Sequence, residues 1–171
     1  DFFFFFTRTP MQIHRRFCFV VRELCCKATF TKAKQASLTT SCRHDFKGKT
    51  CAEIAAAPVK KTYRVEDVTI PRGVKSYIIG LTYKGYINIP EDGIYSFYLS
   101  SDDGSMLYID GKQVIDNDGL HAPGEVTGQA ALKQGYHPIE VQYFDHGGGS
   151  INLKVCDNNG KEMPFTYLYA H

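Results

Sequence analysis

GIYSFYLSSDDGSMLYIDGKQVIDN, residues 93–117, carries the clearest structural signal in this chain of 171 residues. In its first part Tyr95, Phe97 and Leu99 alternate with serines and a tyrosine, which is the period of a β-strand that buries one face. The Asp-Gly pair at 110–111 lies between two apolar runs and is typical of the tight turn of a β-hairpin. The segment therefore predicts a strand, a polar loop and a hairpin of two further strands.

The same alternation returns towards the C-terminus, in HPIEVQYF (residues 137–144) and SINLKV (residues 150–155). Clusters of Pro, Gly, Asn and Asp separate the runs, and no long helical period competes with them. Many short strands joined by turns predict an all-β fold, an antiparallel sandwich or barrel. The strands expected to share one core are 94–99, 106–109, 139–144 and 151–155. The side chains expected to be buried there are Leu99, Leu107, Ile109, Val141 and Leu153.

Composition and charge limit the classes of function. Hydrophobic residues make up 43% of the chain and charged residues 22%, which is the balance of a globular rather than a disordered protein. The net charge of +2 combines +8 in residues 1–61 (12 basic, 4 acidic) with −6 in residues 62–171 (8 basic, 14 acidic). An acidic body repels phosphates, which argues against nucleic-acid binding. No apolar run approaches the roughly 18 residues of a membrane span.

The N-terminal third differs from the rest of the chain. The run of phenylalanines at 2–6 precedes Arg8, the reverse of a secretory signal, and the chain begins at Asp1. We interpret this segment as the truncated front of a longer protein or as wrongly assigned sequence. Five of the six cysteines lie here without a C-x-x-C motif, so we expect unpaired thiols. Residues 1–35 are expected to pack poorly, and the predicted domains are 1–40 and 41–171.

Polar residues gather in three loops between the predicted strands: SSDDGS (100–105), DNDGLH (116–121) and DHGGG (145–149). Carboxylate oxygens beside glycines suit Ca²⁺ or sugar hydroxyls, although the spacing is not that of an EF-hand. The alternative is that Asp, Asn and Gly are simply the residues that β-turns use. The candidate ligands for carbohydrate are Asp102, Asp103, Asp118 and His121.

Two segments carry a family likeness: GYINIPEDGIYSFYLSSDDGSMLYIDGKQVIDN (residues 85–117) and GYHPIEVQYF (135–144). Together they strongly resemble the PA14 domain, a module of bacterial glycosidases, adhesins and toxins. The tail EMPFTYLYAH (162–171) is similar to the close of PA14 modules at the C-terminus of family 20 glycoside hydrolases. The segment ATFTKAK (28–34) looks like the last strand of the small β-sandwich that precedes the module there.

This resemblance implies a β-sandwich that binds carbohydrate as an accessory module of a β-N-acetylhexosaminidase-like enzyme. Residues 1–40 would then be the truncated end of a preceding β-sandwich plus a linker, and residues 41–171 the PA14 domain. The implied partners are a glycan or glycoconjugate and the catalytic domain of the parent chain. The implied location is the bacterial exterior, cell surface or periplasm.

The resemblance also implies a metal site. In the sugar-binding adhesin branch of the family, two consecutive Asp residues hold a Ca²⁺ ion that coordinates sugar hydroxyls, and Asp102 and Asp103 occupy that motif here. We expect either a cis peptide bond between them with clustered oxygens, or a trans bond and no calcium site. The chain has no Trp, so Tyr108, Tyr143 or Phe144 either stacks against the sugar or belongs to the core.

Two other functions remain to be weighed. The module could be purely structural, with the same loops acting only as turns. Catalysis in this chain is not expected, because a glycosidase needs two carboxyls about 5–5.5 or 6.5–9.5 Å apart across the bond. Asp102 and Asp103 are adjacent and would diverge in an extended strand. In addition, 171 β-rich residues cannot hold the α/β barrel of family 20 enzymes.

Overall fold

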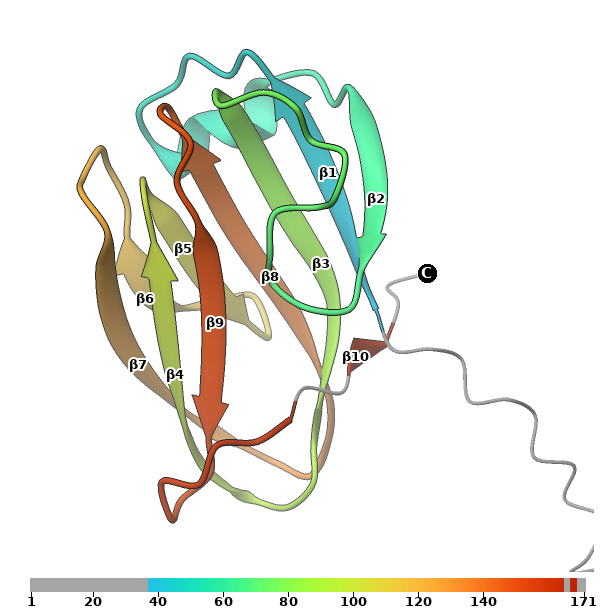
Figure 1. Ribbon diagram of the computed structural model, residues 1–171. Helices are drawn as coiled ribbons and strands as arrows, with labels where there is room; N and C mark the ends of the chain where they lie inside the picture. The colour runs from blue at the N-terminus through green and yellow to red at the C-terminus, as the bar shows by residue number, and fades with distance from the viewer. Residues whose placement is uncertain (1–36, 165–166, 169–171) are drawn as a thin grey trace, which may run out of the picture. The chain divides into compact units, whose positions relative to one another are not determined.

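The computed structural model describes residues 37–164 and 167–168, which form two facing antiparallel β-sheets (Figure 1). The larger sheet has the order β2-β1-β3-β8-β5-β6, with β10 pairing with β3, and the smaller sheet has the order β7-β4-β9. The strands are β1 (Leu38–His44), β2 (Lys61–Val65), β3 (Ile79–Ile89), β4 (Gly93–Ser101), β5 (Ser105–Ile109), β6 (Lys112–Asn117), β7 (Gly124–Leu132), β8 (Gly135–Asp145), β9 (Ile151–Cys156) and β10 (Tyr167–Leu168), and the 3₁₀ helix η1 is Cys51–Ala56.

The all-β prediction is confirmed for the described residues. The expectation that residues 1–35 pack poorly concerns residues outside the described part of the chain. The division at residue 40 stays a prediction, but β1 begins at Leu38 and pairs with both β2 and β3. Among the described residues, no helix is long and apolar enough to cross a membrane.

The core lies between the two sheets, as the alternating pattern predicted. On β4 the side chains of Tyr95, Phe97 and Leu99 are all but fully buried, while the positions between them are partly exposed. Burial of these faces is the main force that holds the sheets together, at about 25 cal/mol per Å² of apolar surface. The five side chains predicted to be buried all belong to this core: Leu99, Leu107, Ile109, Val141 and Leu153.

The predicted hairpin joins β5 to β6. Asp110 and Gly111 form its turn with φ values of 52° and 72°. A two-residue turn with both residues in the left-handed region matches the twist of the strands on either side, and Asp-Gly is favoured there because Gly adopts it freely. The turn therefore sets the pairing of Ile109 with Lys112 and of Tyr108 with Gln113, and a β-bulge then shifts the register so that Leu107 pairs with Ile115.

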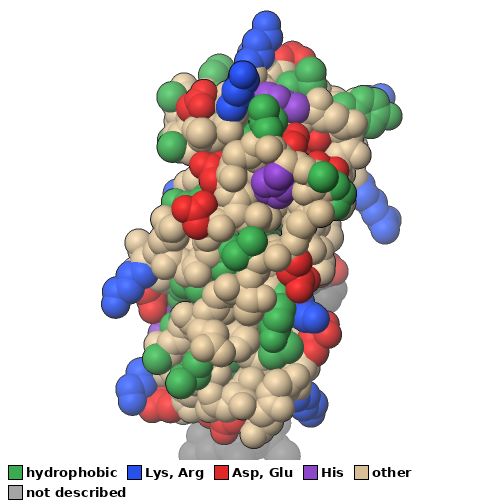
Figure 2. All heavy atoms as spheres, turned by 90° about the vertical axis from the view of Figure 1, so that its left-hand side faces the viewer, with side chains coloured by type: hydrophobic (Ala, Val, Ile, Leu, Met, Phe, Trp, Pro, Cys, Tyr) green, Lys and Arg blue, Asp and Glu red, His purple; other side chains and the backbone are tan. Residues whose placement is uncertain are grey.

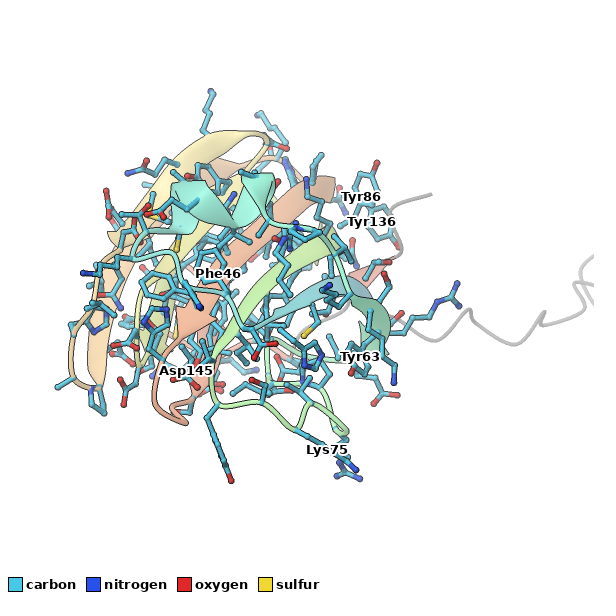
Figure 3. The ribbon with its side chains drawn as sticks, turned by 90° about the horizontal axis from the view of Figure 1, so that it is seen from above. Phe46, Tyr63, Lys75, Tyr86, Tyr136 and Asp145 are labelled. Carbon is cyan, nitrogen blue, oxygen red and sulfur yellow. The ribbon has the colours of Figure 1, made fainter. Side chains whose placement is uncertain are left out.

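A second, smaller core lies on the outer face of the larger sheet, where η1 covers it. Phe46, labelled in Figure 3, is buried there with Met106, Phe144 and residues from η1. The ring centroids of Phe46 and Phe144 are 5.9 Å apart. The free cysteines of the described residues, Cys42, Cys51 and Cys156, are buried and unpaired. Burial raises the pKa of Cys51, which keeps its thiol protonated.

His137 is expected to make the stability of the fold depend on pH. Its Nδ1 lies 2.7 Å from an Asp110 carboxylate oxygen and its Nε2 2.8 Å from the Lys133 carbonyl oxygen, so both nitrogens donate only in the charged imidazolium. Burial lowers the pKa of His137, but these hydrogen bonds and the charge of Asp110 outweigh it and raise the pKa above its ordinary value. The stabilisation is therefore complete below the ordinary pKa of about 6.5 and is lost as the pH rises through the raised value.

Replacing His137 with Gln tests this by urea unfolding at about pH 5.5 and about pH 8.5. The free energy of unfolding of the variant should fall further below that of the native chain at the lower pH. A difference of the same size at both pH values would contradict the expectation.

Candidate functional site

Three loops meet at the upper end of the sandwich in Figure 1: those between β4 and β5, between β6 and β7, and between β8 and β9. Asp103, on the first loop, connects the other two. One of its carboxylate oxygens accepts a hydrogen bond from the backbone N–H of His121 (3.2 Å), and the other accepts one from the N–H of His146 (3.0 Å). The predicted residues Asp103 and His121 are thus neighbours, although 18 positions separate them.

Asp102 is held through its backbone. Its N–H donates to the carbonyl of Ser150 (3.0 Å), and its own carbonyl accepts the hydroxyl of Tyr143 (2.7 Å). Burial raises the pKa of Tyr143, so this hydroxyl stays protonated and remains a donor. The peptide bond between Asp102 and Asp103 is cis, which agrees with the backbone part of the first expected outcome; the clustered oxygens of that outcome stay a prediction. The carboxylate of Asp102 receives no hydrogen bond from any described residue.

Asp118 is bound by backbone groups of the protein, and its role as a carbohydrate ligand stays a prediction. One of its carboxylate oxygens accepts hydrogen bonds from the backbone N–H groups of Cys51 and Gly119, both at 2.8 Å. The side chain thereby attaches the start of η1 to the loop between β6 and β7. Its carboxylate is engaged with η1, and its loop approaches the Asp pair where the backbones of Gly104 and Gly119 pack together.

His121 closes the loop between β6 and β7 with its ring. Nδ1 lies 2.8 Å from the carbonyl oxygen of Ala122, and Nε2 lies 3.0 Å from that of Asn117. Burial lowers the pKa of His121, but the two carbonyls and the charges of Asp103 and Asp102 outweigh this and raise it. The ring therefore holds its proton more firmly than a free imidazole does. Figure 2 shows histidine side chains at this end of the molecule among acidic and apolar ones.

The loop between β8 and β9 belongs to the site, although the sequence argument gave its residues no role. Asp145 is only 2% exposed, and its carboxylate accepts hydrogen bonds from the backbone N–H groups of Gly147, Gly148 and Gly149. Three successive glycine amides around one carboxylate fix the loop against Asp102. The motif DHGGG could have indicated this role, because its Asp is followed closely by three glycines, whose backbone N–H groups have no side chain beside them.

Of the three aromatic side chains that the sequence left open between stacking and the core, two belong to the core. Tyr143 and Phe144 are fully buried and belong to the two cores, and Tyr108 lies on the outer face of the larger sheet. The ring at the rim of the three loops is instead Tyr77, which is 73% exposed and adjoins Gly148. Tyr77 was missed because it lies outside every alternating segment.

The two carboxylates suit a cation that prefers oxygen ligands, but they supply too few ligands to hold it alone. Asp102 and Asp103 offer two adjacent carboxylates, whereas Ca²⁺ takes about 6–8 oxygen ligands. No group of three or more His, Cys, Asp or Glu side chains that could hold a metal ion occurs among residues 37–164 and 167–168. The remaining ligands would have to be backbone carbonyls, water or hydroxyls of a bound molecule.

Comparisons with known proteins agree with this architecture. The chain is 36% identical over 77 residues to a β-hexosaminidase of Porphyromonas gingivalis, and 41% identical over 68 residues to an α-agarase of Thalassotalea agarivorans. These matches cover 44% and 40% of this chain but only 9% and 4% of the two relatives, so the chain spans a small part of their length.

Two solved structures have the same fold. The PA14 domain of the antifreeze protein MpAFP superposes with a TM-score of 0.67 at 17% identity, covering 80% of this chain and 92% of that one. A PA14 sugar-binding domain from an RTX adhesin superposes with a TM-score of 0.67 at 15% identity, covering 79% and 99%. The family model of the PA14 domain matches residues 34–167. The chain therefore belongs to the PA14 domain family.

Proposed function

We propose that this PA14 domain is a carbohydrate-binding accessory module of an exported, β-N-acetylhexosaminidase-like glycoside hydrolase. The observation that carries the proposal is the Asp102 carboxylate, which has no hydrogen-bond partner among the described residues at the meeting point of three loops. A carboxylate without a partner in the protein keeps its acceptor positions for an external ligand. The likeness to segments of a β-hexosaminidase and an α-agarase supports a role beside a polysaccharide-degrading domain.

We further propose that Asp102 and Asp103 hold Ca²⁺. The ion would supply a positive charge with open coordination positions for sugar hydroxyls. The chain's own contribution is to fix the carboxylate of Asp103 through the amides of His121 and His146, and the backbone of Asp102 through Ser150 and Tyr143. Their carboxylate charges would offset the charge of the ion.

The sugar ring would find its apolar surface on Tyr77. Aromatic rings stack on the C–H face of a pyranose because both surfaces are apolar, while the sugar hydroxyls remain available for polar groups. Tyr77 adjoins the glycine loop that packs against Asp102, and Leu120, 51% exposed, lies on the loop that contacts Asp103. These two side chains would form the rim of the glycan site.

A purely structural module is the second candidate, and specific contacts favour it. The carboxylates of Asp103, Asp118 and Asp145 all accept backbone N–H groups and so tie the loops together without any ligand. In that case the carboxylate of Asp103 would hold the three loops together and would bind no ion.

Calorimetric titration of the full chain with calcium chloride separates the two candidates. The accessory-module proposal predicts saturable binding of one ion, followed by binding of oligomers of N-acetylglucosamine or of agarose that is lost when a chelator is added. A flat calcium titration together with no glycan binding would leave the structural role as the function.

A further inference from the structure

A groove crosses the outer face of the larger sheet, away from the three loops. It has a volume of about 360 Å³, which is within the roughly 300–1,000 Å³ range of ligand-binding clefts. Strands β3, β8 and β5 supply its floor, and the turn between β5 and β6 limits one end. The side chains that line it include Lys84, Tyr86, Tyr108, Pro138, Glu140 and Gln142.

The register of the strands explains why these side chains meet. Lys84 on β3 is paired with Glu140 on β8, and Glu140 is paired with Tyr108 on β5, so the three form one row across the sheet. In the next row Tyr86 is paired with Pro138. Directly paired residues of neighbouring strands point to the same face. The row is therefore a consequence of pairing between segments far apart in the sequence.

The polar side chains of the groove are held in place by one another. The Nζ of Lys84 lies 3.0 Å from one carboxylate oxygen of Glu140, and the side-chain amide of Gln142 donates to the other at 2.8 Å. The carboxylate is thus fixed on both sides and its charge is balanced by the ammonium group. The groove consequently offers fixed donors and acceptors without a net charge.

The aromatic side chains border this polar row. Tyr86 and Tyr108 are partly exposed, and among the described residues their hydroxyls make no hydrogen bond. Tyr108 is held from one side by the small core under η1. Tyr136, 53% exposed, lies beside Tyr86 in Figure 3 and extends the aromatic surface beyond the groove.

We propose that this groove is a second glycan site, which binds an uncharged oligosaccharide chain independently of calcium. A pyranose presents an apolar C–H face and a rim of hydroxyls, which match tyrosine rings beside a carboxylate, an ammonium and an amide. The balanced Lys84–Glu140 pair favours a neutral sugar over an anionic one. The proposal does not depend on the loop site, because no residue is shared between them.

Binding is tested by calorimetry and by amide chemical shifts, using neutral hexasaccharides of chitin, agarose, cellulose and xylan in the presence of a chelator. At least one should bind the native chain, and Tyr86→Ala should weaken that binding at least about tenfold, because a stacking face is lost. Tyr98→Ala is the matched control, since Tyr98 is a partly exposed tyrosine on the outer face of the smaller sheet, below Lys154. This control should bind normally.

Two further variants keep the test decisive. Glu140→Gln removes the charge but keeps the shape, and should weaken binding while the melting temperature stays within a few degrees. Asp103→Asn, in the loop site, should leave this chelator-resistant binding intact. No binding of any of the four probes, unchanged binding by Tyr86→Ala, or a loss caused by Asp103→Asn would each overturn the proposal.

Discussion

Replacing Asp103 with Asn is expected to abolish calcium-dependent glycan binding while the chain remains folded. The amide removes one negative charge from the pair of carboxylates, and calcium affinity depends strongly on the number of charged ligands. We expect a loss of at least about 100-fold in calcium affinity, or about 2.7 kcal/mol. Asn keeps one acceptor oxygen for the amides of His121 and His146, so the fold should lose only about 1–2 kcal/mol for the other.

The matched control for this variant is Asp92→Asn. Asp92 also accepts a backbone N–H, from Gln134, but it lies at the opposite end of β4 from Asp103. Calcium and glycan titrations of both variants, with unfolding curves for each, measure the two effects separately. If the Asp103 variant binds glycan as tightly as the native chain with a chelator present, the metal mechanism is wrong and any sugar binds elsewhere.

Replacing Gly149 with Ala is expected to destabilise the fold by about 3 kcal/mol and lower its melting temperature by roughly 6–12 °C. A Cβ at this position would overlap the carbonyl oxygen of Asp102. That carbonyl also accepts the hydroxyl of the buried Tyr143, so it cannot move without breaking a hydrogen bond inside the core. The added methyl group must therefore separate the loop from Asp102 and disturb the proposed calcium site.

Gly147 provides the control within the same loop. A Cβ at Gly147 meets nothing within 4 Å, and neither glycine has a φ in the left-handed region, so only the surroundings differ between the two substitutions. Gly147→Ala should change the free energy of unfolding by less than about 1 kcal/mol. Equal stabilities of the two variants in thermal unfolding would show that the contact between Gly149 and Asp102 is not tight.

The sequence predicted the structure best for features that depend on a single short segment. Alternation in residues 94–99 determines which side chains face the core, because successive side chains of a strand point to opposite faces. The Asp-Gly pair at 110–111 determines a hairpin, because it fits a turn that few other pairs adopt. Both features are local, so they could be predicted without knowledge of the sheet order.

The sequence was less informative about the site, even though it indicated Asp102 and Asp103. It gave no sign that one carboxylate oxygen of Asp118 binds the start of η1, 67 residues away. It also gave no role to Asp145 or to Tyr77. The contacts of these three residues depend on which loops become neighbours in the fold, and the sequence of a single loop does not show this.

The sequence by itself therefore determined four strands of the core, the hairpin and the family, and it indicated the pair of carboxylates. Only the tertiary structure determined that Phe144 is buried under η1 on the outer face of the sheet, and that Lys84, Glu140 and Tyr108 line one groove. The physical reason is that the two kinds of feature depend on interactions over different distances along the chain. Alternation and turn preference act over a few residues, whereas the register of β3, β8 and β5 joins segments about 30 or more positions apart, and burial of the common core selects it.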